Sequence, residues 1–254
     1  MPVFDLNGKH VFIAGGSRGI GASAALLAAR LGASVSINYL NNAAAAGQLC
    51  AEINSIGARS FAVRADVSVD GAIDAAVDSA VRELGPMNGL VVSAGVFEGQ
   101  SIGEMTVEFW DRVMAINVRG TFLSVRAAAR HMREAGSGGS IVIYTSTAGQ
   151  RGSAVYSAYA ASKGAQTIFM RSMALELAPD RIRVNCVAPA WTETDMAAPS
   201  LDAIGRDIVA AGFPLGRIGL PEDVANVTCF LLSAAAEFIT GSTITVDGGM
   251  DMRG

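Results

Sequence analysis

The chain of 254 residues contains no apolar run that reaches the roughly 18–20 residues needed for a membrane-spanning helix. The opening residues, MPVFDLNGKHVFIAGG, lack a basic segment followed by an uninterrupted apolar one, so we expect no signal peptide. Basic residues occur singly or in loose pairs and the net charge is −4, which disfavours nucleic acid and membrane surfaces as partners. These absences predict a cytoplasmic protein with no nucleic-acid or membrane partner.

The sequence also has few of the residues that bind metals or form disulfides. The three cysteines, Cys50, Cys186 and Cys229, are odd in number and far apart, which is typical of small buried apolar side chains. The two histidines, His10 and His131, share no metal-ligand spacing with a cysteine or a carboxylate. We therefore expect a reduced protein without a metal.

Short apolar runs alternate with longer helical patterns along the whole chain, in which 51% of the residues are hydrophobic. The expected strands are 10–14, 34–38, 60–65, 89–93, 140–144, 183–188 and 243–246, and the expected helices cover roughly 19–31, 42–56, 70–84, 106–134, 156–178 and 221–235. This alternation predicts an α/β protein with a doubly wound, seven-stranded parallel sheet and helices on both faces. No linker or internal repeat divides the chain, so we expect a single domain over residues 1–254.

The least regular stretch runs from Pro189 to Gly219 and contains a short expected helix near 201–211. Long segments after a late strand of such a sheet often cover the ligand crevice at the carboxyl ends of the strands. A plain surface insertion is the alternative. We expect a substrate lid over about 190–219.

The segment AGGSRGIG, residues 14–21, follows the first expected strand and opens the first expected helix. Gly15, Gly19 and Gly21 permit a tight turn and a close approach of the backbone to a ligand. The helix start offers free N–H groups and a positive dipole end to a phosphate. In this context the loop, with Ser17, Arg18 and Ile20, predicts a dinucleotide site, although a purely structural turn would also use glycine.

The second expected strand predicts which dinucleotide is bound. An NAD site usually carries an acidic residue about 20 residues beyond the glycines, and none occurs between Gly21 and Glu52. Asn38 and Tyr39 stand in that place, and Arg18 lies within the glycine loop. A nearby cation without a carboxylate favours a 2′-phosphate, so we expect NADP(H) to be preferred while NAD(H) stays possible; a solvated Arg18 is the alternative.

The motif YAASK places Tyr159 and Lys163 four residues apart, which puts both side chains on one face of a helix. A phenol with an ordinary pKa near ~10 is a poor base at neutral pH. A neighbouring ammonium stabilises the phenolate, so we expect Lys163 to lower the pKa of Tyr159.

The glycine loop, YAASK and the strand pattern together make the chain similar to the short-chain dehydrogenase/reductase family, from GKHVFIAGGSRGIG to ITGSTITVDGGM. The resemblance implies a Rossmann fold and hydride transfer between a nicotinamide and a ketone or secondary alcohol. It gives Tyr159 the acid/base role, Ser146 the polarisation of the substrate oxygen, Lys163 a place in the proton relay, and Asn117 a relay water. The pattern looks most like the 3-oxoacyl-acyl-carrier-protein reductase branch.

The same resemblance implies further cofactor contacts at Asp66, Val67, Ala94, Gly95, Pro189, Thr192 and Thr194. Four positions depart from the family pattern, namely Ala14, Val92, Ser93 and Ala190. Changes at Ala14 and at Val92–Ser93 remove side-chain hydrogen bonds that brace the loop and the fourth strand, so we expect an effect on stability or cofactor affinity. The four catalytic positions are unaffected.

The small-molecule substrate is expected to be a medium-sized oxygenated ketone or alcohol, in a pocket lined by Phe97, Glu98, Gln150, Arg151, Tyr156, Trp191 and the segment 195–215. Asp180, in the turn before the sixth strand, disfavours docking of an acidic carrier protein there. A sugar or polyol dehydrogenase is one alternative, and a non-catalytic nucleotide-sensing protein is another. Relatives pair the helices that correspond to 106–134 and 156–178, so the resemblance implies a homotetramer.

Overall fold

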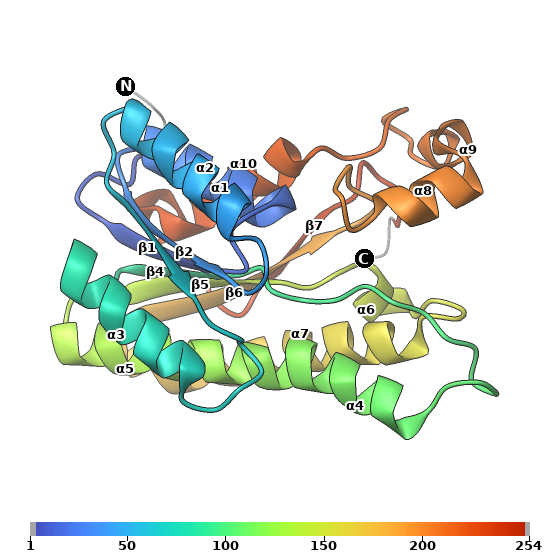
Figure 1. Cartoon of the computed structure of the whole chain (residues 1–254), viewed down its shortest axis with the longest axis horizontal. Helices are drawn as coiled ribbons and strands as arrows, with labels where there is room; N and C mark the ends of the chain where they lie inside the picture. The colour runs from blue at the N-terminus through green and yellow to red at the C-terminus, as the bar shows by residue number, and fades with distance from the viewer. Residues whose placement is uncertain (1–3, 252–254) are drawn as a thin grey trace.

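The computed structural model describes residues 4–251, so the first three and last three residues of the expected domain lie outside the described residues. Seven parallel strands form one sheet in the order β3-β2-β1-β4-β5-β6-β7, between two layers of helices (Figure 1). The strands are β1 (His10–Ala14), β2 (Ser34–Tyr39), β3 (Ser60–Arg64), β4 (Gly89–Val92), β5 (Gly139–Tyr144), β6 (Ile182–Pro189) and β7 (Thr243–Val246). The expected single-domain Rossmann fold is confirmed, and the strand ends differ from expectation by at most one residue.

The central strands are buried on both faces, which explains why they appear in the sequence as continuous apolar runs. All five residues of β1 and all four of β4 are buried. The strand order reverses between β1, which pairs with β2 on one side, and β4 on the other. The reversal opens a crevice at the carboxyl ends of the strands, where ligands bind in folds of this kind.

Helices cover the two faces of the sheet (Figure 1). One face carries α1 (Gly19–Arg30), α2 (Ala43–Ser55) and α10 (Pro221–Leu232), and the other carries α3 (Ala72–Leu84), α5 (Gly120–Ala135) and α7 (Ser157–Leu177). Each face has its own hydrophobic core. The large side chains Phe12, Ile13 and Ile141 are fully buried, and burial of each contributes about 1.5–3 kcal/mol to folding.

Two expected helices are divided in the structure. The segment expected as one helix over 106–134 comprises α4 (Val107–Met114), a π-helical turn (Ala115–Arg119) and α5. The expected lid contains α8 (Ala198–Ile204) and α9 (Arg206–Ala211), which enclose a small core around Leu201 and Phe213. A further short helix, α6 (Ala148–Arg151), lies between β5 and α7 and was not expected.

Among residues 4–251, no helix combines the length and the apolar character that a bilayer crossing requires. Within the same range, no three His, Cys, Asp or Glu side chains gather in a way that would hold a metal ion.

Candidate active site

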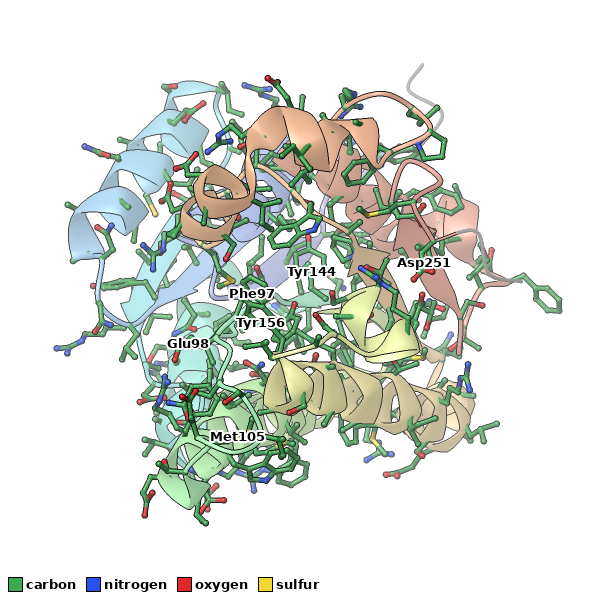
Figure 2. All side chains as sticks on the ribbon, turned by 90° about the vertical axis from the view of Figure 1, so that its right-hand side faces the viewer. Phe97, Glu98, Met105, Tyr144, Tyr156 and Asp251 are labelled. Carbon is green, nitrogen blue, oxygen red and sulfur yellow. The ribbon has the colours of Figure 1, made fainter. Side chains whose placement is uncertain are left out.

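A cavity of about 1010 Å³ lies at the carboxyl ends of the strands, between the glycine loop and the segment after β6. Figure 2 faces this end of the molecule, with Phe97, Tyr156 and Tyr144 near its centre. The expected cofactor residues that line the cavity are Gly15, Ser17, Arg18, Gly19, Ile20, Asn38, Tyr39, Asp66, Val67, Ala94, Gly95, Tyr159, Lys163, Pro189, Thr192 and Thr194. The structure therefore brings together residues from most of the length of the chain. Of the expected cofactor residues, only Gly21 is absent from the lining.

The glycine loop packs so closely against its neighbours that two of its glycines have no room for a side chain. Gly15 has a φ of +75°, and a Cβ there would lie 2.6 Å from the backbone of Ala94. A Cβ on Gly21 would lie 2.5 Å from the carbonyl oxygen of Gly15. Gly19, at the start of α1, borders the cavity, so the free N–H groups and the positive dipole end of α1 lie beside it. The loop is thus a cradle that fits a dinucleotide diphosphate.

Asn38 braces the glycine loop from behind. Its side-chain oxygen accepts a hydrogen bond from the Gly15 N–H at 3.2 Å, and its amide nitrogen donates to the Ala65 carbonyl at 3.0 Å. The side chain is buried, with 1% of its surface exposed. The structure therefore ties the Asn38 amide to protein backbone, although the residue still borders the cavity. Ala14, directly before Gly15, is fully buried and supplies no side-chain hydrogen bond to the loop.

Arg18 and Tyr39 border the same end of the cavity, as the sequence predicts. Arg18 is exposed, and within residues 4–251 no carboxylate pairs with its guanidinium group. Asp66 also borders this end, and one of its carboxylate oxygens accepts hydrogen bonds from the N–H and the hydroxyl of Ser68. Within residues 4–251, this end of the cavity thus offers the Arg18 guanidinium without an ion-pair partner, while the Asp66 carboxylate is bound by Ser68.

Ser146 and Tyr159 meet at the opposite end of the cavity. Ser146 lies just after β5, Tyr159 lies in the first turn of α7, and both side chains border the cavity. Burial raises the pKa of the Tyr159 phenol above its ordinary value of 10.0, and the nearby Ser146 hydroxyl opposes this rise. The phenol is therefore protonated at neutral pH in this structure.

Lys163 lies one turn after Tyr159 on α7, and only 6% of its surface is exposed. Its Nζ donates a hydrogen bond to the Tyr144 carbonyl at 2.8 Å and lies 5.7 Å from the centre of the Tyr159 ring. Burial lowers the pKa of Lys163 from 10.5 to about 8. The expectation that Lys163 lowers the phenol pKa is not met here, because burial dominates the pKa of Tyr159 and Lys163 is not among the contributing groups.

Asn117 is fully buried in the π-helical turn and is not itself part of the cavity lining, although it bonds to Val96, which is. Its side chain accepts from the Val96 N–H at 2.9 Å and donates to the Val96 carbonyl at 3.1 Å and to the Ser162 hydroxyl at 2.9 Å. Its main-chain carbonyl accepts from the Thr121 hydroxyl at 2.6 Å and from the Gln166 amide at 2.8 Å. These contacts give Asn117 a bracing role, and the water-holding role that the resemblance implies stays a prediction.

The expected substrate residues divide into two groups. Phe97, Arg151, Tyr156 and Trp191 line the cavity. Gln150 does not, because it is exposed and its amide faces Thr245 at 3.4 Å. Glu98 also lies outside the cavity lining. It forms an ion pair with Arg112, and Arg112 does line the cavity.

Three functional residues were not found from the sequence. The Tyr144 carbonyl anchors Lys163, the Ser162 hydroxyl links Asn117 to the Tyr159 carbonyl at 2.7 Å, and Arg112 borders the cavity. Ser162 had a signal, because it directly precedes Lys163 on the same helix. The role of a backbone carbonyl, such as that of Tyr144, cannot be predicted from the residue type, because every residue has one.

The fold and this site together define an oxidoreductase that uses a nicotinamide dinucleotide, because a phosphate cradle, a neighbouring Ser and Tyr and a buried Lys border one cavity. A family model described as enoyl-(acyl carrier protein) reductase matches residues 14–251. The chain is 40% identical to the short chain dehydrogenase/reductase AacuN of Aspergillus aculeatus, with 96% of each chain covered. The chain therefore belongs to the short-chain dehydrogenase/reductase family.

Other relatives have more specific names. The versicolorin reductase stcU of Emericella nidulans is 36% identical, with 97% of each chain covered. The L-rhamnose 1-dehydrogenase (NAD(P)(+)) of a Sphingomonas species is 37% identical, with 96% of this chain and 97% of the relative covered. A solved short-chain dehydrogenase/reductase from Mycobacterium marinum superposes with a TM-score of 0.93 at 35% identity, covering 99% of this chain and 98% of that one. These proteins belong to the same family but differ in the activities that their names give.

Proposed function

We propose that this enzyme is an NADP(H)-dependent oxidoreductase that interconverts a ketone and a secondary alcohol. The observation that carries the proposal is that Ser146 and Tyr159 border the same cavity as the glycine cradle. A substrate oxygen that reaches both hydroxyl groups lies beside the part of the cavity expected to hold the nicotinamide. The bound cofactor supplies or accepts the hydride.

The protein's own part in the reaction is to orient the substrate and move a proton. In the reductive direction the Ser146 hydroxyl hydrogen bonds to the substrate oxygen and the Tyr159 phenol donates its proton to that oxygen. The phenol is suited to donation because burial keeps it protonated at neutral pH. Lys163, with a pKa of about 8, is poised near neutral pH to return a proton toward Tyr159.

The preference for NADP(H) rests on charge. Arg18 borders the cavity without a carboxylate partner in the described part of the chain, and Tyr39 borders it from the end of β2, where NAD enzymes usually carry an acid. A 2′-phosphate would gain a charge-assisted hydrogen bond from the Arg18 guanidinium and would meet no repelling carboxylate from β2.

Two other functions stay testable. A sugar or polyol dehydrogenase is favoured by the relative named as an L-rhamnose 1-dehydrogenase. A non-catalytic nucleotide sensor is the alternative from another class; it would bind the dinucleotide without using Ser146 or Tyr159.

The experiment is an absorbance assay of NADPH and NADH oxidation with a panel of ketones and β-ketoesters, and of NADP⁺ and NAD⁺ reduction with secondary alcohols, sugars and polyols. We expect turnover with NADPH to exceed that with NADH, and Tyr159→Phe to lower kcat by at least about 100-fold while nucleotide binding persists. Tyr144→Phe is the matched control, because the Tyr144 hydroxyl bonds to Thr228 at 2.9 Å and its change alters stability rather than chemistry. Normal turnover in Tyr159→Phe would remove the acid/base assignment, and binding without any turnover would favour the sensor.

The arrangement of the chain supports three further proposals. We propose that 190–219 is a lid, because most residues of 190–197 border the cavity while Leu201, Val209, Phe213 and Ile218 help to form a separate small core. The three free cysteines support residence in a reducing compartment such as the cytoplasm.

We also propose a homotetramer. The outer faces of α4, α5 and α7 carry the exposed apolar side chains Val107, Trp110, Phe122, Ile168 and Leu175. Leu175 is 81% exposed, which disfavours a monomeric surface. Light scattering at micromolar protein should give the mass of four chains, and a monomer peak would contradict the proposal.

A further inference from the structure

Aromatic side chains from three separate segments surround the Tyr159 phenol. Phe97 and Tyr156 stack face to face, with ring centres 4.5 Å apart and planes 2° apart. Phe97 also makes edge contacts with Tyr159 at 4.9 Å and with Trp191 at 5.7 Å. Phe97, Tyr156 and Trp191, here called the aromatic wall, line the cavity and remain partly exposed to it, and Figure 2 shows Phe97 and Tyr156 together at the open end.

We propose that the aromatic wall binds a planar aromatic ring, so that the substrate is a ketone or alcohol carried on, or fused to, an aromatic ring system. The inference rests on the proposed function, because it places the ring beside the hydroxyl groups that act on the substrate oxygen. An oxygen bound by Tyr159 brings the adjacent part of its molecule against Phe97, whose ring is in contact with the phenol. Aromatic rings at such distances attract each other in stacked or edge-to-face arrangements, beyond the effect of apolar burial.

The polar groups near the wall are poorly suited to a sugar. A buried polyol needs a hydrogen-bond partner for each hydroxyl group. Arg112 and Arg151 border the cavity, but their guanidinium groups pair with Glu98 and Asp251. The aromatic wall itself is flat and largely apolar, and the Ser153 hydroxyl and the Asp195 carboxylate are further polar groups that border the cavity.

The wall must open slightly to admit a ring, because a stack with centres 4.5 Å apart leaves no space between its members. Tyr156 is the member that moves. The preceding residue, Val155, has a φ of +68°, a left-handed conformation that is strained for a β-branched side chain and that relaxes if the segment shifts. Beneath Tyr156, a Cβ on Gly99 would lie only 3.0 Å from the Tyr156 ring, so the absence of a side chain there permits the present closed arrangement.

The first test compares 2-tetralone with trans-2-decalone, which have the same carbon skeleton and an unconjugated ketone but differ in the planar ring. With NADPH, we expect kcat/KM for 2-tetralone to be at least tenfold higher. Tyr156→Leu and Phe97→Leu should each bring this ratio close to one. Phe238→Leu is the matched control, because Phe238 is fully exposed and away from the cavity lining, and it should leave the ratio unchanged. Equal or better use of trans-2-decalone, or a ratio that persists in both wall variants, would overturn the inference.

A binding measurement separates this inference from the proposed function. The chain has two tryptophans, so Trp110→Phe leaves Trp191 of the wall as the fluorescent reporter. We expect 2-naphthol to quench this fluorescence saturably, and Tyr156→Leu to weaken its binding at least tenfold. Binding of 2-naphthol without turnover of any ketone would leave the aromatic site standing and refute the proposed function. Turnover of ketones without 2-naphthol binding or ring preference would refute the aromatic site and leave the proposed function standing.

Discussion

The pKa of Lys163 can be measured directly, and it tests how strongly burial in the fold perturbs the ammonium group beside the proposed acid/base Tyr159. Its side chain is almost fully buried, its Nζ has a single protein acceptor in the Tyr144 carbonyl, and burial lowers its pKa from 10.5 to about 8. The chain contains one other lysine, Lys9, which lies just before β1 and away from the cavity. We expect Lys163 to lose its proton with a midpoint near pH 8 in the protein without cofactor.

The same difference in pKa has a consequence for stability. A lysine whose pKa falls on folding weakens the fold below its folded pKa, and this cost disappears as the pH rises through the unfolded pKa. A change from 10.5 to about 8 corresponds to a cost of about 3 kcal/mol at neutral pH. About 1 kcal/mol of it should disappear between pH 7 and pH 9. The free energy of unfolding of the wild type should therefore rise over this range relative to Lys163→Met, which lacks the ammonium group.

The assay is an NMR titration of protein labelled with ¹³C at lysine Cε, in which the two lysines give two signals and Lys9 serves as the internal reference. Urea unfolding of wild type and Lys163→Met at pH 7 and pH 9, at one protein concentration and with reductant, gives the stability difference. A Lys163 signal that titrates above pH 10, or a stability difference that does not change between the two pH values, would refute the reasoning.

Four further changes test separate parts of the site. Arg18→Leu should raise the Kd of NADPH about tenfold and leave that of NADH within about twofold, measured by calorimetry. Gly21→Ala should weaken binding of either nucleotide at least about tenfold, because its Cβ would meet the Gly15 carbonyl; Gly103→Ala, in open space, is the control. Asn117→Leu should lower the free energy of unfolding by about 2–4 kcal/mol in urea, because it removes the side-chain partner of both the N–H and the carbonyl of Val96. Val155→Gly should raise Tm by about 2–4 °C in calorimetry by removing the strain at φ +68°, and an unchanged or lower Tm would contradict it.

The sequence was sufficient to predict the sheet and the order of its elements. Strands buried on both faces are continuous apolar runs, and each run but the last is followed by a helical pattern long enough to cross back over the sheet. The positions of Gly15, Ser146 and Tyr159 were also predictable, because each occurs at a fixed place relative to a strand end or within a spaced motif. The structure brings all three to one cavity.

Details that depend on three-dimensional neighbours were not predictable. Asn38 was expected to face the cofactor, but the nearby Gly15 N–H and Ala65 carbonyl bind its amide. Gln150 was placed in the pocket by its nearness to Ser146 in the sequence, but α6 directs its side chain toward Thr245. The pKa of Tyr159 was expected to follow the charge of Lys163, whereas burial has the larger effect. In each case the outcome depends on groups that lie far away in the sequence, on a backbone group, or on burial in the folded protein.

The π-helical turn shows how one such detail links substrate recognition to chemistry. A π-helical turn lies between α4 and α5 and changes the direction of the side chains that follow. It places the Asn117 amide between two segments that are far apart in the sequence, one containing Val96 and the other containing Ser162. One contact is Val96, directly before Phe97 of the aromatic wall; the other is Ser162, directly before Lys163 and bonded to the Tyr159 carbonyl. A single buried side chain therefore fixes the wall relative to the proton donor. For this reason, loss of the Asn117 amide should impair kcat and KM together, even though Asn117 itself lies outside the cavity lining.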